Sequence, residues 1–311
     1  MIVNKKLVSG IVSVVFLSLI FYPIVVANED TTASNTIPTK VSTSSAPLIQ
    51  SDTPRLVDET LDSSWQKEYW AVLVGINNYP GSLGDLPYSI NEILSFKTTL
   101  LAGGNWEESH IRVVTDEDAT RDGIFDALQW LVSNEDTNDV SVFFYAGHGG
   151  QGSSNEYLSV YNSSIYDYEL DEKLDDLEGC IVVILDCCHA GGFIEDIGER
   201  GRVVLSACRK DNLTYQYSGL KSGIFGYFIN VSLQKYTKFA EGTFLVALVA
   251  SYLYSKKLSE DYAGDYTIIP RIYDGCFGRV RLINRHSYSS ISFHEMFLNP
   301  SKNRELRMWN M

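Results

Sequence analysis

From Trp65 onward, strand-length runs of apolar residues alternate with amphipathic stretches. Five runs stand out, at residues 70–76, 111–115, 140–147, 180–186 and 202–207. The last three are nearly continuous in Val, Ile, Leu and Phe, without polar alternation. Strands that are buried on both faces have this composition, and such strands usually lie in parallel sheets. The pattern therefore predicts a parallel sheet that is covered on both faces.

The stretches between the runs predict the helices that cover this sheet. Ser89 and Glu92 have the spacing of a capping box before a helix that continues to about residue 101, and Thr120 can cap a helix that continues to Leu131. The alternation of strands and helices predicts an α/β fold with helices on both faces of the sheet. The remaining expected elements are helices over 223–236 and 243–257 and closing strands over 268–283, with a turn at Asp274-Gly275.

The N-terminal part has a different character. Two lysines precede the uncharged apolar stretch 7–27, and small residues before Asn28 fit a signal-peptidase site. We expect a signal peptide over 1–27, or an uncleaved membrane anchor, because the stretch is long enough to span a bilayer. Residues 28–64 are rich in Ser, Thr and Pro, which predicts a disordered linker or pro-segment. The protein is therefore expected to be secreted or extracytoplasmic, and to contact a membrane only if residues 7–27 remain uncleaved.

Composition limits the function classes. The chain has 311 residues, of which 45% are hydrophobic and 21% charged, with a formal net charge of −14. This size and apolar content suffice for a real core, and we expect one globular domain over 65–284, followed by a tail over 285–311 without an assigned element. The negative charge argues against nucleic acid as a partner, because phosphates attract positive proteins. It is compatible with a cationic substrate.

The five cysteines are an odd number, so in an exported chain at least one is expected to be unpaired or to pair between molecules. Cys180, Cys187 and Cys208 fit core positions. The role of Cys276 stays open, because spacing alone does not reveal a disulfide.

Two of the apolar runs end in residues that can carry chemistry. The run 140–147 leads into His148, and the run 180–186 leads into two cysteines and a second histidine. Functional groups of parallel α/β sheets gather where strands end, and neighbouring strands lie about 5 Å apart. A cysteine beside a histidine is the minimal activated nucleophile, since the imidazole takes the thiol proton and the thiolate attacks.

Strand geometry distinguishes the candidates. Side chains alternate along a strand, so Asp186 and Cys188 share a face while Cys187 points the other way. Cys188 is therefore the better nucleophile. The histidine that follows it directly is a poor base, because adjacent side chains diverge, so His148 is the better one. The backbone N–H groups of Gly149 and Cys188 could form an oxyanion hole.

The motifs YAGHGG, at residues 145–150, and DCCHAGG, at residues 186–192, occur in this order and each follows an apolar run. They resemble the motifs of caspase-like cysteine peptidases, particularly metacaspases and prokaryotic caspase homologues, and the similarity extends over about residues 70–282. The resemblance implies a caspase-like three-layer sandwich, with a six-stranded, mostly parallel sheet and helices on both faces. It implies His148 as base and Cys188 as nucleophile, with no third catalytic side chain and no cofactor required for the chemistry. The chain departs from the family at Ala146, where a Ser is usual.

The resemblance also bears on specificity, because metacaspases use acidic residues to bind Lys or Arg. Asp186 matches the acid two positions before the metacaspase cysteine, and Glu92 stands where the family's other acid is usually Asp. Two recessed carboxylates would pair with a guanidinium or ammonium group and reject an acidic side chain. This implies cleavage after Arg or Lys. The alternative for Glu92 is the capping-box role.

Calcium is a further implication. Residues 166–170 lie where metacaspases have an acidic stretch associated with calcium. Calcium would then act as an activator, and a solvated acidic surface is the alternative. The side chains that would contribute oxygen ligands are Asp167, Glu169, Asp171 and Glu195.

Self-processing is open as well. Arg200 and Arg202 lie in the connector between the fourth and fifth runs, where caspase-like enzymes are often cut. Arg55 and Lys40 in the linker are alternative sites, and an unprocessed active chain is equally compatible with the sequence.

These observations lead to one main hypothesis. The chain is expected to be an exported caspase-like cysteine endopeptidase that cleaves proteins or peptides after Arg or Lys, through a thioester acyl-enzyme formed by a Cys–His dyad. Two alternatives remain. One is a catalytically silent caspase-like binding module. The other is a peptidase of the legumain or clostripain kind, with a different residue preference.

Overall fold

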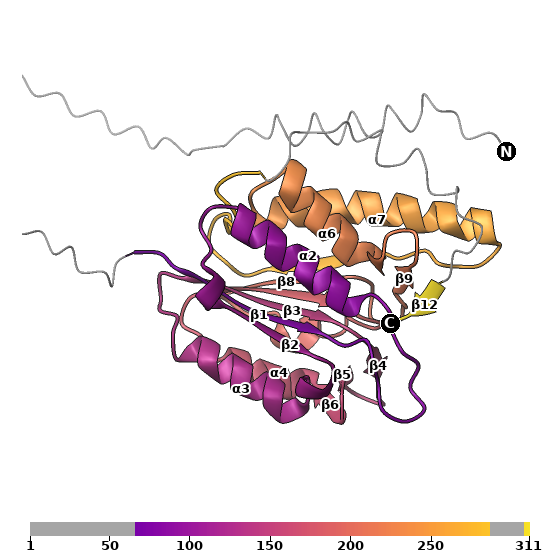
Figure 1. The fold of residues 1–311 in the computed structure, drawn as a ribbon, viewed down its shortest axis with the longest axis horizontal. Coiled ribbons are helices and arrows are strands. Elements are labelled where there is room, and N and C mark those ends of the chain that lie inside the picture. Colours follow the sequence, from indigo (N-terminus) through magenta and orange to yellow (C-terminus); the bar gives the residue numbers. More distant parts are fainter. Residues whose placement is uncertain (1–65, 287–307) are drawn as a thin grey trace, which may run out of the picture. The chain divides into compact units, whose positions relative to one another are not determined.

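The computed structural model describes residues 66–286 and 308–311, and its central element is a six-stranded sheet (Figure 1). The strand order is β11-β8-β7-β3-β1-β2, in which β11 alone runs antiparallel to its neighbour. The five predicted runs match the parallel strands to within one residue at each end. The strands are β1 (Tyr69–Gly75), β2 (Ile111–Thr115), β3 (Val140–Ala146), β7 (Cys180–Asp186), β8 (Arg202–Ser206) and β11 (Arg271–Asp274).

Helices cover both faces of this sheet, so the predicted three-layer arrangement is confirmed (Figure 1). One face carries α2 (Ser89–Ala102), α6 (Ile224–Lys235) and α7 (Ala240–Tyr262). The other carries α3 (Arg121–Val132) and α4 (Asp167–Leu174). The short α5 (Ile194–Ile197) and the single-turn helices η2 (Glu108–His110) and η3 (Asp116–Asp118) lie in the connections.

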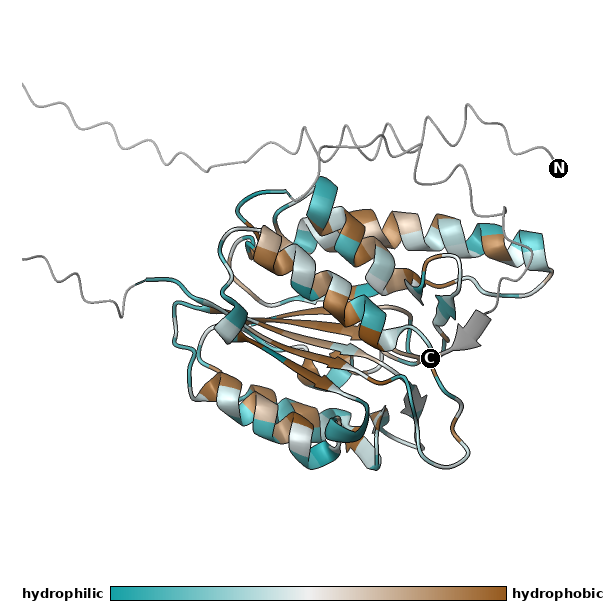
Figure 2. Cartoon of the chain, in the orientation of Figure 1, coloured by the Kyte–Doolittle hydropathy of each residue, from teal (hydrophilic) through white to brown (hydrophobic). Residues whose placement is uncertain are grey.

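The apolar runs form the middle layer because helices remove both of their faces from water. Every residue of β1 and of β3 is buried. Figure 2 shows the central strands as hydrophobic, while the helices carry hydrophilic residues on their outer sides. A strand in this position needs apolar side chains at successive residues rather than at alternate ones, which is why the runs lack polar alternation.

The helix ends follow the sequence signals in one case and not in another. The Thr120 side chain accepts the N–H of Gly123 at 3.0 Å and caps α3, as predicted. The capping box at Ser89 and Glu92 is wrong, because Tyr88 is the N-cap of α2 and its side chain makes no capping bond. The Glu92 side chain instead reaches Gly223 at the start of α6.

The helix α7 is longer than the helix expected over 243–257. It ends at Tyr262, and its C-cap residue Ala263 has a left-handed φ of 51°. No helix within residues 66–286 or 308–311 is long and apolar enough to cross a membrane. The predicted signal or anchor segment and the linker lie outside the described residues, as do Lys40 and Arg55.

Two small sheets were not predicted. One consists of β4 (Gly149–Gln151), β5 (Glu156–Val160) and β6 (Ser163–Tyr166), and the other of β10 (Ser222–Gly223), β9 (Tyr215–Tyr217) and β12 (Met308–Asn310). Figure 1 shows β4, β9 and β12 near the same end of the central sheet. The expected pair of closing strands over 268–283 is wrong in part, because β11 is followed by a loop with a single isolated bridge between Arg281 and Phe239.

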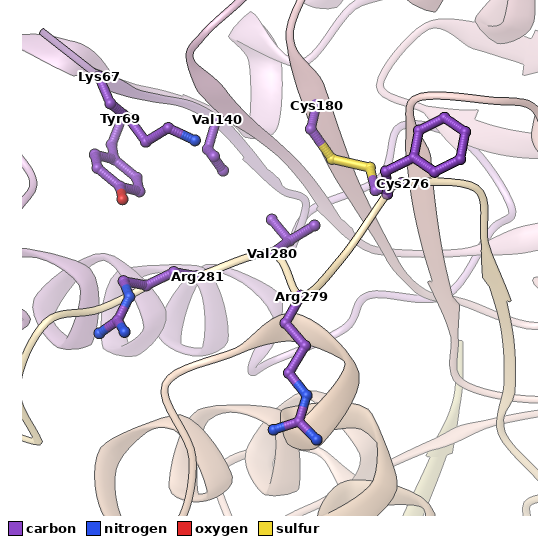
Figure 3. Close-up of a pocket in the computed structure, with 9 residues that line it drawn as sticks. Lys67, Tyr69, Val140, Cys180, Cys276, Arg279, Val280 and Arg281 are labelled. Carbon is purple, nitrogen blue, oxygen red and sulfur yellow. A yellow bond between two sulfur atoms is a disulfide. The ribbon is translucent and has the colours of Figure 1, made fainter. Parts of the chain in front are cut away.

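A hollow of about 380 Å³ lies at the opposite, amino-terminal edge of the sheet (Figure 3). Tyr69, Val140 and Cys180, the first residues of β1, β3 and β7, form part of its wall. Figure 3 shows the guanidinium groups of Arg279 and Arg281 pointing apart. The hollow therefore does not gather its basic groups around one point, and it lies at the other end of the strands from the predicted chemistry.

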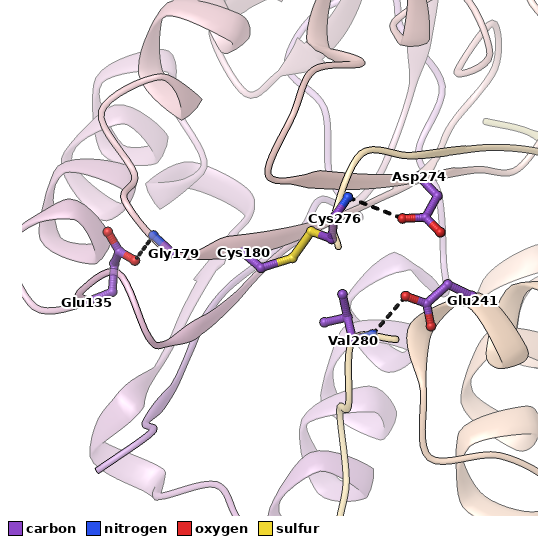
Figure 4. Close-up of a disulfide and its surroundings, with 7 residues drawn as sticks. All are labelled: Glu135, Gly179, Cys180, Glu241, Asp274, Cys276 and Val280. Atoms are coloured by element: carbon purple, nitrogen blue, oxygen red, sulfur yellow. Dashed lines mark hydrogen bonds between the residues drawn. A yellow bond between two sulfur atoms is a disulfide. The ribbon is translucent and has the colours of Figure 1, made fainter. Parts of the chain in front are cut away.

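A disulfide links Cys180 to Cys276 at this amino-terminal edge of the sheet (Figure 4). It joins the start of β7 to the loop after β11, across 96 positions of sequence. The expectation that Cys180 is a simple core residue is therefore wrong, and the open role of Cys276 is now assigned. The thiols of Cys187, Cys188 and Cys208 are buried and unpaired.

Candidate active site

The structure brings the ends of β3 and β7 together as neighbours. The two strands pair in parallel with Ala146 opposite Asp186, and the N–H of Gly147 donates to the Asp186 carbonyl at 3.3 Å. His148 and Cys188 each follow two residues after these paired positions. Both residues therefore lie at the carboxyl edge of the sheet, at the ends of adjacent strands. In the sequence, the strands β4 to β7 and the helix α4 lie between them.

The backbone around His148 is fixed by two tyrosine hydroxyls that the sequence analysis did not single out. The N–H of His148 donates to the Tyr79 hydroxyl at 2.8 Å, and the Tyr145 hydroxyl donates to the His148 carbonyl at 2.8 Å. A Cβ atom on Gly147 would lie 2.5 Å from one hydroxyl and 2.6 Å from the other, so no side chain fits between them. Tyr79 and Tyr145 are thus positioning residues for the imidazole.

The imidazole has a defined tautomer. His148 Nε2 lies 2.7 Å from the carbonyl oxygen of Gly84. Since a carbonyl can only accept a hydrogen bond, Nε2 carries the proton, and Nδ1 holds the lone pair of the neutral ring. Burial lowers the pKa of His148 below its usual value, with hydrogen bonding to Gly84 acting in the opposite direction. At neutral pH the ring is uncharged and its Nδ1 can accept a proton.

The thiol of Cys188 lies against the backbone of Thr214. Its Sγ is 3.6 Å from the carbonyl oxygen of Thr214 and accepts the N–H of Thr214 at 3.4 Å. Cys188 is only 2% exposed, and burial raises the pKa of its thiol to about 11. Within the described residues the thiol and the His148 imidazole are not hydrogen-bonded to each other. Each side chain is held by a different backbone carbonyl.

The second histidine of the motif faces elsewhere. The Nδ1 atom of His189 lies 2.8 Å from the carbonyl of Lys210, and its backbone has a positive φ of 61° that turns the chain after the cysteine. This arrangement explains why adjacent residues of the motif do not share a site.

Gly149 and Cys188 approach each other closely at the backbone. A Cβ atom on Gly149 would lie 2.4 Å from the Cys188 carbonyl oxygen, so only glycine fits. Gly149 lies opposite Leu158 of β5. In the neighbouring residue pair of the ladder, the N–H of Ser159 donates to the backbone carbonyl of His148. Hydrogen-bonded and non-hydrogen-bonded pairs alternate in an antiparallel ladder, so the Gly149 N–H points away from β5. The Cys188 N–H donates to the carbonyl of Met311 at 3.1 Å.

Asp186 and Glu92 form a buried carboxyl pair beside the cysteine. Their exposed fractions are 0% and 2%. Asp186 accepts the N–H of Gly226 at 2.7 Å and the hydroxyl of Thr214 at 3.3 Å, while Glu92 accepts the N–H of Gly223 at 2.5 Å. The predicted pair of acids is therefore assembled, from β7 and α2, against the start of α6.

The proton balance of this pair follows from burial. Burial raises the pKa of Asp186 to about 6, and the hydrogen bond that it shares with Glu92 limits the rise. Burial and the neighbouring Asp186 charge together raise the pKa of Glu92 well above its usual value. Burial and mutual repulsion thus disfavour two carboxylate charges side by side in this pair. The Glu92 Oε1 atom has no hydrogen-bond partner within the described residues.

A surface hollow of about 470 Å³ reaches Glu92, one member of this pair. Glu92, Ser222 and Gly226 belong to its wall, together with Tyr227 and Asn230 of α6. Glu92 thus borders an accessible depression that Asp186 does not line, and Lys221 and Lys235 belong to the same wall.

The four predicted calcium ligands do not converge on one point. Glu169 pairs with Arg121 at 2.6 Å, Asp171 pairs with Arg202, and Glu195 pairs with Lys210 at 2.6 Å. Asp167 is buried and accepts backbone N–H groups. No cluster of three or more metal-ligating side chains occurs in residues 66–286 and 308–311.

The two arginines of the connector differ. Arg202 is the first residue of β8, is buried, and pairs with Asp171 and Asp175. The peptide bond after it lies within the sheet, so cleavage there would require the sheet to open. Arg200 is exposed, with its guanidinium 4.8 Å from the Phe277 ring centroid. Of the two, only Arg200 lies at an accessible position.

Residues 68–263 match the family model described as the caspase domain. The chain belongs to the caspase family. The matched range contains both motifs and every strand of the central sheet except β11.

Three proteins with similar sequences are metacaspases. The chain is 28% identical to Metacaspase-1 of Schizosaccharomyces pombe over 155 residues, which cover 43% of this chain and 36% of the relative. It is 32% identical to Metacaspase-1 of Candida albicans over 151 residues, covering 40% and 34%. Metacaspase-4 of Arabidopsis thaliana is 31% identical over 148 residues, covering 42% and 35%. The matched region spans about a third of each relative's length.

A solved structure supports the same fold. Protein GSU0716 from Geobacter sulfurreducens superposes with a TM-score of 0.53 and 14% sequence identity, covering 72% of this chain and 100% of that chain. At this level of identity the likeness concerns the caspase-like fold alone.

Proposed function

We propose that this caspase-family protein is an exported endopeptidase that cleaves after Arg or Lys, with Cys188 as nucleophile and His148 as general base. The single observation that carries the proposal is the register of β3 and β7, which delivers both residues to one edge of the sheet. Family membership supplies the reaction class, and the carboxyl pair beside Cys188 supplies the preference for a cationic side chain.

The chemistry follows from the protonation states. Both the thiol and the imidazole are neutral at pH 7, so the thiol proton passes to His148 Nδ1 as Sγ attacks the substrate carbonyl carbon. The oxyanion that forms accepts the N–H groups of Gly149 and Cys188. Collapse breaks the C–N bond, the imidazolium protonates the leaving amine, and a thioester remains. Water then attacks the thioester with His148 again as base, which releases the acid product and regenerates the thiol.

Preference for Arg or Lys is supported by the Asp186–Glu92 pair. A guanidinium or ammonium group that enters the hollow would favour the ionised form of Glu92 and donate a hydrogen bond to its unpartnered oxygen. An acidic substrate side chain would face the Asp186–Glu92 carboxyl pair at the Glu92 end of the hollow, which disfavours it, while Lys221 and Lys235 belong to other parts of the wall.

Export is supported by the Cys180–Cys276 disulfide, since such bonds persist in oxidising compartments. Calcium activation remains a prediction. The acids concerned are engaged by Arg121, Arg202 and Lys210, so the cation would have to compete with these side chains.

A panel of aminomethylcoumarin peptides that end in Arg, Lys, Asn or Asp tests this proposal, with and without calcium. We expect hydrolysis of the Arg and Lys peptides and none of the Asp peptide. Cys188→Ala should abolish turnover, whereas Cys208→Ala, which removes another buried thiol, should retain it. Turnover of the Asn peptide alone would favour a legumain-like specificity. Absence of turnover, with no alkylation of Cys188 by a peptidyl inhibitor, would favour the silent binding module.

A further inference from the structure

The residues at the end of the described chain lie in the proposed active site. Strand β12 (Met308–Asn310) pairs antiparallel with β9, with Trp309 opposite Gln216. The next residue, Met311, continues this ladder, because its N–H donates to the Thr214 carbonyl at 3.2 Å. The segment therefore adds a third strand to the small sheet formed by β9 and β10.

Met311 makes a second backbone bond, and this one involves the nucleophile. Its carbonyl oxygen accepts the N–H of Cys188 at 3.1 Å. That N–H is the group proposed to bind the oxyanion of a substrate carbonyl. Met311 thus stands where the residue that precedes a scissile bond would stand, with its carbonyl directed at the oxyanion donor and its N–H held by Thr214.

The same contact explains how the thiol is shielded. Thr214 flanks the Cys188 Sγ on one side through its N–H and carbonyl, and the Met311 backbone is bonded to both Thr214 and Cys188. Met311 is 1% exposed and Cys188 is 2% exposed. A substrate strand cannot take the Thr214 carbonyl or the Cys188 N–H while Met311 holds them.

We propose that residues 308–311 are an intramolecular inhibitor that occupies the peptide-binding edge of β9 and must leave before substrate binds. This inference rests on the proposed function, because it takes Cys188 as the nucleophile. The segment mimics substrate through its backbone alone. Met311 carries no positive charge, so it leaves the Asp186–Glu92 pair without a cation, and a strand that presents Arg has an additional ion pair with which to displace it.

The size of the effect follows from occupancy. Attachment to the same chain gives such a segment an effective concentration on the order of millimolar, which favours occupancy even where backbone bonds alone bind weakly. A segment bound about 90% of the time lowers the apparent reactivity of the site about tenfold, because only the open fraction reacts.

Two variants test the proposal. Deletion of residues 308–311 removes the strand, and Met311→Pro keeps its length but removes the N–H that donates to Thr214. Phe277→Ala is the control, because this side chain is 86% exposed and lies beside the disulfide at the other edge of the sheet. The first readout is the rate at which iodoacetamide alkylates Cys188, located by peptide mass spectrometry. The second is KM for an Arg peptide.

We expect alkylation about tenfold faster in both variants and a lower KM with little change in kcat, while Phe277→Ala behaves as the unmodified chain. Unchanged alkylation in variants that retain their melting temperature would overturn the proposal. Hydrogen exchange of the unmodified full chain gives a test that does not depend on the folding of a variant. We expect the backbone amides of Cys188 and Met311 to exchange slowly, because both donate hydrogen bonds. Exchange of both at unfolded-peptide rates would also overturn it.

The two proposals fail in different ways. Faster alkylation without hydrolysis of any peptide would uphold the inhibitory strand and remove the peptidase function. Hydrolysis of Arg peptides by the full chain, with alkylation and KM unaffected by either variant, would uphold the peptidase function and remove the inhibitory strand.

Discussion

Asp186→Asn is expected to make the protein more stable and less active. Asp186 is completely buried, and its pKa of about 6 lies above the value of 3.8 that it has in the unfolded chain. The folded state therefore binds this proton more tightly, so stability decreases as pH rises from about 4 to about 6. A shift of about two units corresponds to about 3 kcal/mol at pH 7. Asparagine keeps the shape and can still accept the N–H of Gly226 without carrying a charge.

Urea unfolding at pH 4 and pH 7 measures this difference. The variant should match the unmodified chain at pH 4 and exceed its free energy of unfolding by up to about 3 kcal/mol at pH 7. Loss of the ionic partner should lower kcat/KM for an Arg peptide about 10- to 100-fold, the value of a hydrogen bond to a charged group. A variant that is less stable at pH 7, or that keeps the pH dependence of the unmodified chain, would refute the assignment of a buried charge to Asp186.

Glu135→Gln is the matched control for this experiment. Glu135 is another buried carboxylate, but it binds the backbone N–H groups of Glu178 and Gly179 near the start of β7, away from the proposed site. Glutamine retains only one carbonyl acceptor for these two donors. Burial also raises the pKa of Glu135, so loss of the charge and loss of an acceptor act in opposite directions on stability. We expect kcat/KM for the Arg peptide to stay unchanged in this control, which shows that removing a buried acid does not by itself lower activity.

Three further outcomes follow from the contacts of the fold. Gly149→Ala should reduce kcat for the Arg peptide at least about 100-fold with little change in KM. The added Cβ would lie 2.4 Å from the Cys188 carbonyl oxygen and would shift an oxyanion donor, so an unaltered kcat would contradict this prediction. Tyr79→Phe removes the acceptor of the His148 N–H and should lower kcat about tenfold at constant KM; a change in KM alone would point to a different role. Substitution of both Cys180 and Cys276 by Ser should reduce the free energy of unfolding, measured in urea, by about 4 kcal/mol, because the disulfide closes a loop that spans 96 positions. Equal stability with and without the disulfide would disprove this prediction.

Local patterns in the sequence were sufficient to predict the central sheet. Strands β3, β7 and β8 are buried on both faces, and burial of that kind leaves a nearly continuous apolar run in the sequence. The placement of His148 and Cys188 at one edge of the sheet could be predicted for the same reason, while their catalytic roles stay a prediction. Parallel strands that end at one edge bring their following residues together, whatever the length of chain between them.

The parts that were missed depend on contacts between distant segments. The role of Glu92 was open because its spacing from Ser89 also fits a capping box, and only the packing of α6 against α2 directs its carboxyl group to Gly223. The disulfide could not be predicted because β11 has to pair with β8 before Cys276 reaches Cys180. The strand β12 has three residues, too few for a recognisable hydrophobic period, and its partner lies some ninety residues earlier in the chain.

The most direct test of the account is covalent labelling by a peptidyl-arginine chloromethyl ketone, followed by tandem mass spectrometry. We predict one equivalent of label on Cys188, no label on that position in Cys188→Ser, and labelling that is at least about 100-fold slower in His148→Ala, because the imidazole no longer takes the thiol proton. Stoichiometric label on Cys187 or Cys208, or an unchanged rate in His148→Ala, would contradict the claim that this thiol and this imidazole act together.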